Sequence, residues 1–266
     1  MSTATAKHAP GTFCWPELGT TDQDGAKRFY TSLFGWASSD TPMGPDKPPY
    51  VIFTHKGQAC GALYTLMPEQ TQNGVPPHWG AYVAVDDCDA AIERVKAAGG
   101  ALIMGPHDVM ETLGRMALCS DPQGATFSLW QAKDHIGIGI MGEPGALCWT
   151  ELMAQDTAKA AAFYGSVIGW KTQAVPMGDG EYICWQRPDG EMVGGMTAIT
   201  PEMGPMRPCW VSYFQVADIA ATVKKAADLG AQISVPATKI PNGMQFAILV
   251  DPQGAHFAVL QAAPQA

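Results

Sequence analysis

Short stretches of this chain alternate between apolar and polar positions, and longer stretches between them follow a helical period. Residues 13–18 alternate and carry aromatic side chains, which predicts a β-strand. Residues 22–33 follow with an acidic first turn, apolar residues three to four positions apart, and Gly35 as a stop signal. This pattern predicts an amphipathic helix directly after the strand.

The same order then recurs within the first half of the chain. Further strand patterns occur at residues 50–54, 61–66 and 79–85, and residues 87–98 form a second helical pattern ended by Gly99. A tight turn is predicted where Asp121 opens an Asp-Pro-Gln-Gly segment, because proline fixes φ and glycine accepts a positive φ. The coarse order is therefore strand, helix and several strands, twice over.

The second half of the chain repeats the first. Residues 10–36 and 144–170 are identical at roughly half of their positions, including Cys-Trp-x-Glu-Leu, Phe-Tyr and Gly-Trp. Tyr-Val-Ile-Phe at residue 50 matches Tyr-Ile-Cys-Trp at residue 182, and the Asp-Pro-Gln-Gly-Ala segment recurs at Asp251. Because the order is preserved, the whole unit is duplicated. The expected division is a tail (1–9), a first domain (10–133), a glycine-rich linker (134–142) and a second domain (143–262).

Charge and composition narrow the possible partners. The formal net charge is −9 and the sequence contains no run of lysine or arginine, so nucleic acid and anionic membranes are poor partners. A neutral or cationic small molecule suits this charge better. A hydrophobic share of 47% with 15% charged residues is typical of a globular protein.

Cysteine spacing and the N-terminus indicate the compartment. The seven cysteines contain no C-x-x-C pair, which argues against structural zinc or a disulfide framework and favours buried free thiols. No apolar run approaches the ~20 residues of a membrane span. The N-terminus lacks the layout of a secretory signal, so a cytoplasmic location is expected.

The order and duplication of these motifs resemble the vicinal oxygen chelate (glyoxalase/bleomycin resistance/dioxygenase) superfamily, especially its fused two-domain glyoxalase-like members provisionally labelled hydroxylases. The resemblance covers nearly the whole chain. It implies an α+β fold in which four βαβββ modules pair into two cup-shaped half-barrels, forming an intramolecular pseudo-dimer. Members differ by domain swapping, so the pairing of modules stays open.

Metal-dependent members of that superfamily hold a divalent ion with His, Glu or Gln on module strands, and the ion chelates vicinal oxygens of the substrate. The resemblance places six residues at the ligand positions of the two cups: Trp15, Gly80, Ser128, Trp149, Val211 and Ala258. None of these is a good ligand for a catalytic divalent ion. No metal triad or other cofactor is therefore expected. An altered site for zinc, iron or manganese stays open, using Glu17, His78 and His55, or Glu151 and His256.

Strand alternation indicates which other side chains face the cups. The candidate catalytic residues are Glu17 and Glu151, since a carboxyl group on a mostly apolar wall has a raised pKa and can act as a general base. The candidate ligand-binding residues are Trp15, His78, Tyr82 and Thr126 in the first domain and Trp149, Tyr213 and His256 in the second. Aromatic side chains there would stack on a flat ligand or hold a cation over a ring.

Structural roles compete with each of these functional ones. The glutamates could bond backbone groups, the tryptophans could be core packing, and His78 could cap a strand. Three functions remain: metal-free binding of an aromatic or oxygenated metabolite, a metal-independent acid–base enzyme, and a metal-dependent lyase, isomerase or oxygenase related to lactoylglutathione lyase. The sequence names neither the ligand nor the active cup, and it does not show whether the pseudo-dimer associates further.

Overall fold

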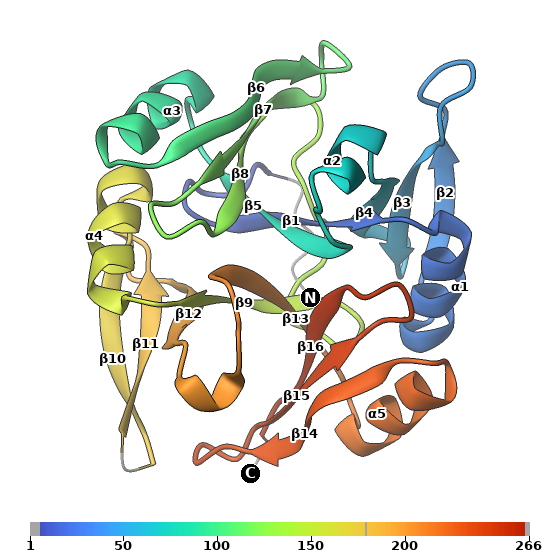
Figure 1. Ribbon diagram of the computed structural model, residues 1–266, viewed down its shortest axis with the longest axis vertical. Helices are drawn as coiled ribbons and strands as arrows, with labels where there is room; N and C mark the ends of the chain where they lie inside the picture. Colours follow the sequence, from blue (N-terminus) through green and yellow to red (C-terminus); the bar gives the residue numbers. More distant parts are fainter. Residues whose placement is uncertain (1–5, 179, 264–266) are drawn as a thin grey trace.

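Each half of the chain forms one eight-stranded mixed sheet with helices packed against it (Figure 1). The computed structural model describes residues 6–178 and 180–263, so residues 1–5 of the expected N-terminal tail lie outside the described residues. The first half contains β1 (Phe13–Thr20), α1 (Gln23–Phe34), β2 (Ala37–Thr41), β3 (Tyr50–His55), β4 (Gln58–Thr65), α2 (Pro68–Gln72), β5 (His78–Ala84), α3 (Cys88–Ala97), β6 (Ala101–Val109), β7 (Gly114–Ser120) and β8 (Thr126–Ala132). The second half contains β9 (Leu147–Ala154), α4 (Thr157–Ile168), β10 (Lys171–Met177), β11 (Gly180–Gln186), β12 (Met192–Ala198), the short 3₁₀ helix η1 (Pro201–Met203), β13 (Cys209–Gln215), α5 (Ile219–Asp228), β14 (Gln232–Lys239), β15 (Gln245–Val250) and β16 (His256–Gln261).

Strand order shows that consecutive modules pair with each other. The first sheet runs β2-β3-β4-β1-β5-β8-β7-β6, and the second runs β10-β11-β12-β9-β13-β16-β15-β14. The two modules of each half meet where their first strands run antiparallel, β1 beside β5 and β9 beside β13. The open α+β cups that the resemblance implied are present, and the sheets do not close into barrels. The pairing of modules, which the sequence left open, is within each half of the chain.

The predicted helices are confirmed, and their ends follow from local chemistry. Helix α1 begins after Asp22, whose Oδ1 accepts from the Gly25 N–H at 2.9 Å, and ends at Gly35 with φ 72°. Helix α3 begins after Asp87, and α5 begins after the equivalent Asp218. The sequence patterns did not indicate the edge strands, such as β2 and β6, or the short helix α2.

The main core lies between the two domains. The Tyr30 hydroxyl of α1 donates to Asp251 Oδ2 at 2.8 Å, and reciprocally the Tyr164 hydroxyl of α4 donates to Asp121 Oδ2 at 3.2 Å. The Phe-Tyr and Asp-Pro-Gln-Gly motifs of one domain therefore bind those of the other. In Figure 1, α1 lies beside α5 and α3 beside α4, so the two domains form a pseudo-dimer.

Two further features complete the fold. The linker is packed rather than loose, because Ile138 is fully buried and its N–H donates to the Cys14 carbonyl oxygen at 2.8 Å. All seven cysteines are free and five of them are buried, as predicted. Among the described residues, no helix is long and apolar enough to cross a membrane.

Candidate functional site

A hydrogen-bonded glutamate lies on the face of the first sheet that points away from the interdomain core, and we call this face the first cup. Glu17 of β1 accepts from the Tyr50 hydroxyl at 2.6 Å and from the Tyr82 hydroxyl at 2.7 Å. The Tyr50 oxygen in turn accepts from Trp15 Nε1 at 3.0 Å. Three strands thus contribute to one network around the carboxyl group.

Burial perturbs the ionisation of this network. Burial raises the pKa of Glu17, and the two tyrosine hydroxyls oppose the shift by donating to the carboxylate. Burial and the nearby charge of Glu17 raise the pKa of Tyr64 to about 12. The carboxyl group therefore keeps a proton to a higher pH than an exposed glutamate does, which suits a general acid or base.

The second cup, on the corresponding face of the second sheet, repeats the network with one change. Glu151 of β9 accepts from the Tyr213 hydroxyl and from Thr197 Oγ1, the latter at 2.7 Å. Trp149 Nε1 donates to the Tyr182 hydroxyl at 2.9 Å, as Trp15 does to Tyr50 in the first cup. Glu151 is buried, whereas Glu17 is partly exposed.

Apolar side chains crowd the second cup. A small cluster separate from the main core lines it, with Met153, Val211, Tyr213 and Ala258 buried. Several partly buried side chains pack against this cluster: Cys148, Trp149, Ile199, Met206, Cys209, Phe246, Ile248 and Leu260. Ile199 and Met206 flank η1, so the connection between β12 and β13 covers the cup with apolar groups.

The equivalent connection of the first domain carries a polar contact instead. Gln70 of α2 donates through Nε2 to the Tyr64 hydroxyl at 3.3 Å. Tyr64 lies on β4 opposite Gly19 of β1, and its hydroxyl occupies the space that a side chain at Gly19 would need. The first cup is therefore bordered by polar groups from both the sheet and the connection that contains α2.

The other predicted site residues lie at the ends of strands. His78 is the first residue of β5, is partly buried, and has its Nδ1 2.8 Å from the Pro76 carbonyl oxygen. Thr126 and His256 begin β8 and β16, and both are exposed. The structure thus gathers Trp15, Glu17 and Tyr82 through one network and Glu151 with Tyr213 in the other.

Several site residues escaped the sequence analysis. Tyr50 and Tyr182 belong to a repeated motif, but only the sheet register shows that they reach Trp15 and Trp149. Thr197 and Tyr64 occupy strands whose facing side the sequence did not settle. His135 follows β8, and its ring lies 4.6 Å from that of Trp15.

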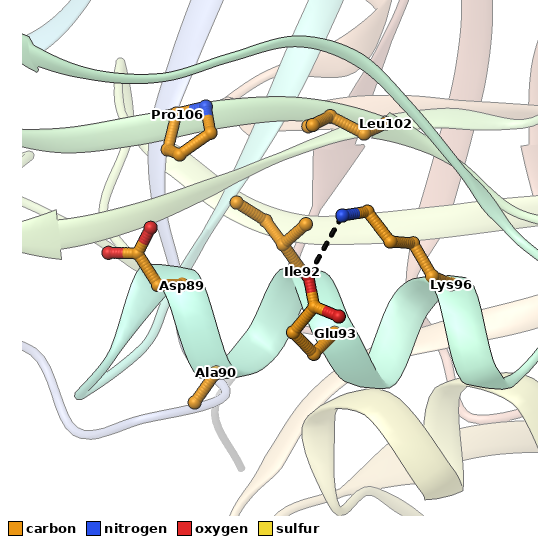
Figure 2. Close-up of a pocket in the computed structure, with 7 residues that line it drawn as sticks. All are labelled: Asp89, Ala90, Ile92, Glu93, Lys96, Leu102 and Pro106. Atoms are coloured by element: carbon orange, nitrogen blue, oxygen red, sulfur yellow. Dashed lines mark hydrogen bonds and ion pairs between the residues drawn. The ribbon is translucent and has the colours of Figure 1, made fainter.

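Two surface hollows lie outside both cups. One is a groove of about 280 Å³ between α3 and β6, where Lys96 pairs with Glu93 at 2.8 Å (Figure 2). A second hollow of about 240 Å³ lies between the domains and includes Asp86, Arg94 and Ile168. Neither contains a residue of the glutamate networks, so the chemistry of the cups is a better guide to a site than the size of these hollows.

Comparison with known proteins agrees with this duplicated architecture. The family profile described as "Glyoxalase/Bleomycin resistance protein/Dioxygenase superfamily" matches residues 12–129 and, separately, residues 146–259. The chain belongs to this superfamily.

Relatives within the superfamily extend over the full length of the chain. CFP32 of Mycobacterium tuberculosis (strain CDC 1551 / Oshkosh), provisionally named a glyoxylase, is 40% identical over 261 residues, covering 98% of both chains. DauV of Streptomyces sp. (strain C5), named an anthracycline biosynthesis protein, is 34% identical over 265 residues, covering 96% of this chain and 94% of its own.

Solved structures of other superfamily members share the fold. The Mn(II)-bound glyoxalase from Novosphingobium aromaticivorans aligns with a TM-score of 0.64 at 15% identity, covering 96% of this chain and 83% of its own. The 2,3-dioxygenase LapB from Pseudomonas sp. KL28 aligns with a TM-score of 0.65 at 13% identity, covering 98% and 95%. At these identities the likeness shows the fold alone.

Some superfamily members are metal-dependent, such as the Mn(II)-bound glyoxalase, but the described residues in the cups of this chain lack a matching set of ligands. Within residues 6–178 and 180–263, no three His, Cys, Asp or Glu side chains are grouped to hold a metal. His55 does not join Glu17 and His78 in a ligand set, because its ring lies against Gly145 between the domains. The described side chains therefore do not fit the family's metal site.

Proposed function

We propose that the protein binds a small aromatic or oxygenated metabolite in a cup, at a hydrogen-bonded glutamate and without the metal triad of its superfamily. The observation that carries the proposal is the repeated network in which a tryptophan N–H, a tyrosine hydroxyl and a strand glutamate face one side of each sheet. Such a network gives a ligand a directed acceptor beside a flat aromatic surface.

Relatives support an aromatic ligand. DauV is named for anthracycline biosynthesis, and anthracyclines are planar aromatic compounds carrying hydroxyl groups. The glyoxylase name of CFP32 supports a small oxygenated metabolite instead. Both kinds of compound offer hydroxyl or carbonyl oxygens to the network.

A second candidate function, metal-independent acid–base catalysis, is favoured by the ionisation of Glu17. Its raised pKa leaves a proton available nearer to neutral pH, and Tyr82 holds the carboxyl group in one orientation. Binding and proton transfer would use the same residue, so one set of variants addresses both.

The test begins with metal content and continues with binding. Elemental mass spectrometry on protein purified without a chelator or histidine tag is expected to find far less than one transition metal per chain. Titration with daunorubicin, an anthracycline, is then expected to show binding that Glu17→Gln or Glu151→Gln weakens about tenfold, because a hydrogen bond to a charged acceptor contributes roughly 1.5–3 kcal/mol.

Two results would contradict this proposal. A stoichiometric transition metal would support the metal-dependent lyase or oxygenase instead. Binding that neither glutamate variant changes would place the ligand outside both cups, with the interdomain hollow at Arg94 as the next location to examine.

A further inference from the structure

Gly80 leaves an unfilled position in the first cup. A Cβ added to Gly80 would meet one atom within 4 Å, the Glu17 carbonyl oxygen at 3.5 Å. By contrast, a Cβ at Gly19 would press on Tyr64 and Leu66, and one at Gly195 would collide with Tyr182. The space above Gly80 is therefore not taken up by a neighbouring side chain.

The second cup fills the same position. Gly80 pairs with Glu17 in the first sheet, and Val211 pairs with Glu151 at the equivalent place in the second. Val211 is buried in the apolar cluster of the second cup. A ligand approaching Glu151 would have to displace the Val211 side chain and the apolar side chains of the connection between β12 and β13. At the equivalent place beside Glu17, Gly80 has no side chain to displace.

The polar groups around Gly80 offer acceptors. The Tyr82 hydroxyl donates its hydrogen to Glu17 Oε2, so the tyrosine oxygen and the carboxylate can both act only as acceptors toward a ligand. His78 faces a carbonyl oxygen with Nδ1, which must therefore carry the ring hydrogen, and in the neutral ring Nε2 is then an acceptor. Burial lowers the pKa of His78 and so favours that neutral form.

Charge in the first cup excludes anions from this position. Among the described residues of β1, β3, β4, β5, β7 and β8, the side chains on the face of Glu17 include no lysine or arginine. Arg115 of β7 points the other way and pairs with Asp89 of α3 at 2.8 Å. A carboxylate or phosphate placed beside Glu17 would be repelled without compensation.

We propose that the first cup is the ligand-binding cup, that the ligand lies over Gly80 between Glu17 and His78, and that it is an uncharged or cationic aromatic molecule bearing an O–H or N–H donor. This proposal rests on the proposed function and assigns it to one cup and one class of ligand. The largely buried rings of Trp15 and Tyr82 form the aromatic wall beside this position, and the exposed Thr126 hydroxyl lies one strand away at the level of Gly80.

A matched set of three ring compounds tests the ligand class: naphthol, its methyl ether and naphthoate. By isothermal titration calorimetry, naphthol is expected to bind at least about tenfold more tightly than the methyl ether, with no detectable heat for naphthoate. Equal affinity for naphthol and its ether, or preferential binding of naphthoate, would overturn the assigned ligand class.

A valine exchange tests the position. Gly80→Val copies the residue that the second cup already carries on the equivalent strand, so the sheet can accept it, and thermal unfolding checks that it does. Naphthol binding is expected to fall by more than about tenfold, whereas Val211→Gly, which opens the second cup, is expected to leave it within about twofold. Unchanged binding in Gly80→Val, or a gain of more than tenfold in Val211→Gly, would contradict the proposal.

Methionine methyl NMR separates failure of this inference from failure of the proposed function. Met116 Sδ lies 4.0 Å from the Tyr82 hydroxyl in the first cup, and Met153 lies in the second, so each methyl signal, assigned by Met→Leu exchange, reports one cup. We expect naphthol to shift Met116 alone. A shift of Met153 alone would move the ligand to the second cup and leave the proposed function standing. No shift and no heat with naphthol or daunorubicin would overturn both.

Discussion

At the first cup, β1 and β5 carry Gly19, His78 and Gly80, whereas at the second cup the equivalent positions carry Met153, Cys209 and Val211. Both cups keep a tryptophan and a glutamate bonded to a tyrosine hydroxyl. At these three positions beside the glutamate, the first cup carries two glycines and a histidine, whereas the second carries packed apolar side chains. The two cups share the same strands and glutamate, and the residues at these few strand positions decide how accessible each carboxyl group is.

At the interface between the domains, the two networks centred on Asp121 and Asp251 are instead alike. Asp121 and Asp251 each accept hydrogen bonds from two backbone N–H groups of their own turn. Each also accepts one from a tyrosine hydroxyl of the other domain. Tyr164 and Tyr30 also each accept a tryptophan N–H. The two aspartate–tyrosine–tryptophan networks are thus matched bond for bond, which gives a reference against which the cups can be compared.

The largest expected effect concerns that interface. Asp121→Ala or Asp251→Ala leaves two buried donors and one partly buried donor without an acceptor, so each is expected to lower the free energy of unfolding by about 3 kcal/mol. Urea denaturation of the two variants should give values within roughly 1 kcal/mol of each other. The exposed Asp24→Ala serves as the control and should cost less than about 0.5 kcal/mol. A large loss in one variant and a small loss in the other would show that the interface is asymmetric too.

A medium-sized effect is expected from exchanging small residues on the strands beside the two glutamates. Gly195 pairs with Glu151 and Ala62 pairs with Glu17, so these positions are equivalent. A methyl group at Gly195 would collide with the Tyr182 ring, and Gly195→Ala is therefore expected to cost about 1–3 kcal/mol.

The reverse exchange provides the matched control. Ala62→Gly removes a buried methyl group without forcing any ring to move and should cost about 1 kcal/mol, measured by the same denaturation. A mild Gly195→Ala variant that keeps the Trp149–Tyr182 hydrogen bond, visible in the indole N–H signal by NMR, would contradict the idea that the second cup is closely packed.

Whether a feature could be predicted from the sequence depended on how far apart its interacting residues lie along the chain. The helix beginning at Asp22 and ending at Gly35 was predictable because its caps and its apolar stripe are local. The repeat predicted the duplication, and the resemblance of its motifs to a known superfamily implied the fold. The alternation of β1 and β5 predicted that Trp15, Glu17 and Tyr82 face the cup, where hydrogen bonds connect them.

Features that depend on register between distant segments were not predictable. The partner of Asp251 is Tyr30, 221 residues earlier, and no local pattern specifies that contact. Tyr50 belonged to a visible repeat, but its distance to Glu17 depends on how β3, β4 and β1 align. The accessibility of Gly80 likewise depends on which neighbours point toward it, and the sequence alone showed only a missing metal ligand.

The smallest expected effect concerns the ionisation of Glu17. Burial raises its folded-state pKa above the ordinary value of 4.5, so the folded protein binds a proton more tightly than the unfolded chain. The resulting stabilisation is fully present below pH 4.5 and is lost as the pH rises through the folded-state pKa. Glu17→Gln carries no such group, so the free energy of unfolding of the variant minus that of the wild type should increase with pH before it levels off.

Tyr82→Phe sharpens this last measurement because it removes a donor that favours the charged carboxylate. The pH-dependent loss of stability should then extend to a higher pH than in the wild type, and adding Glu17→Gln should abolish the extension. Unfolding followed by circular dichroism from pH 4 to pH 8, with Glu151→Gln in parallel, reads out both cups under the same conditions. A flat difference between wild type and Glu17→Gln across that range would mean that water reaches Glu17 freely, and the first cup would then be an open surface rather than a partly desolvated site.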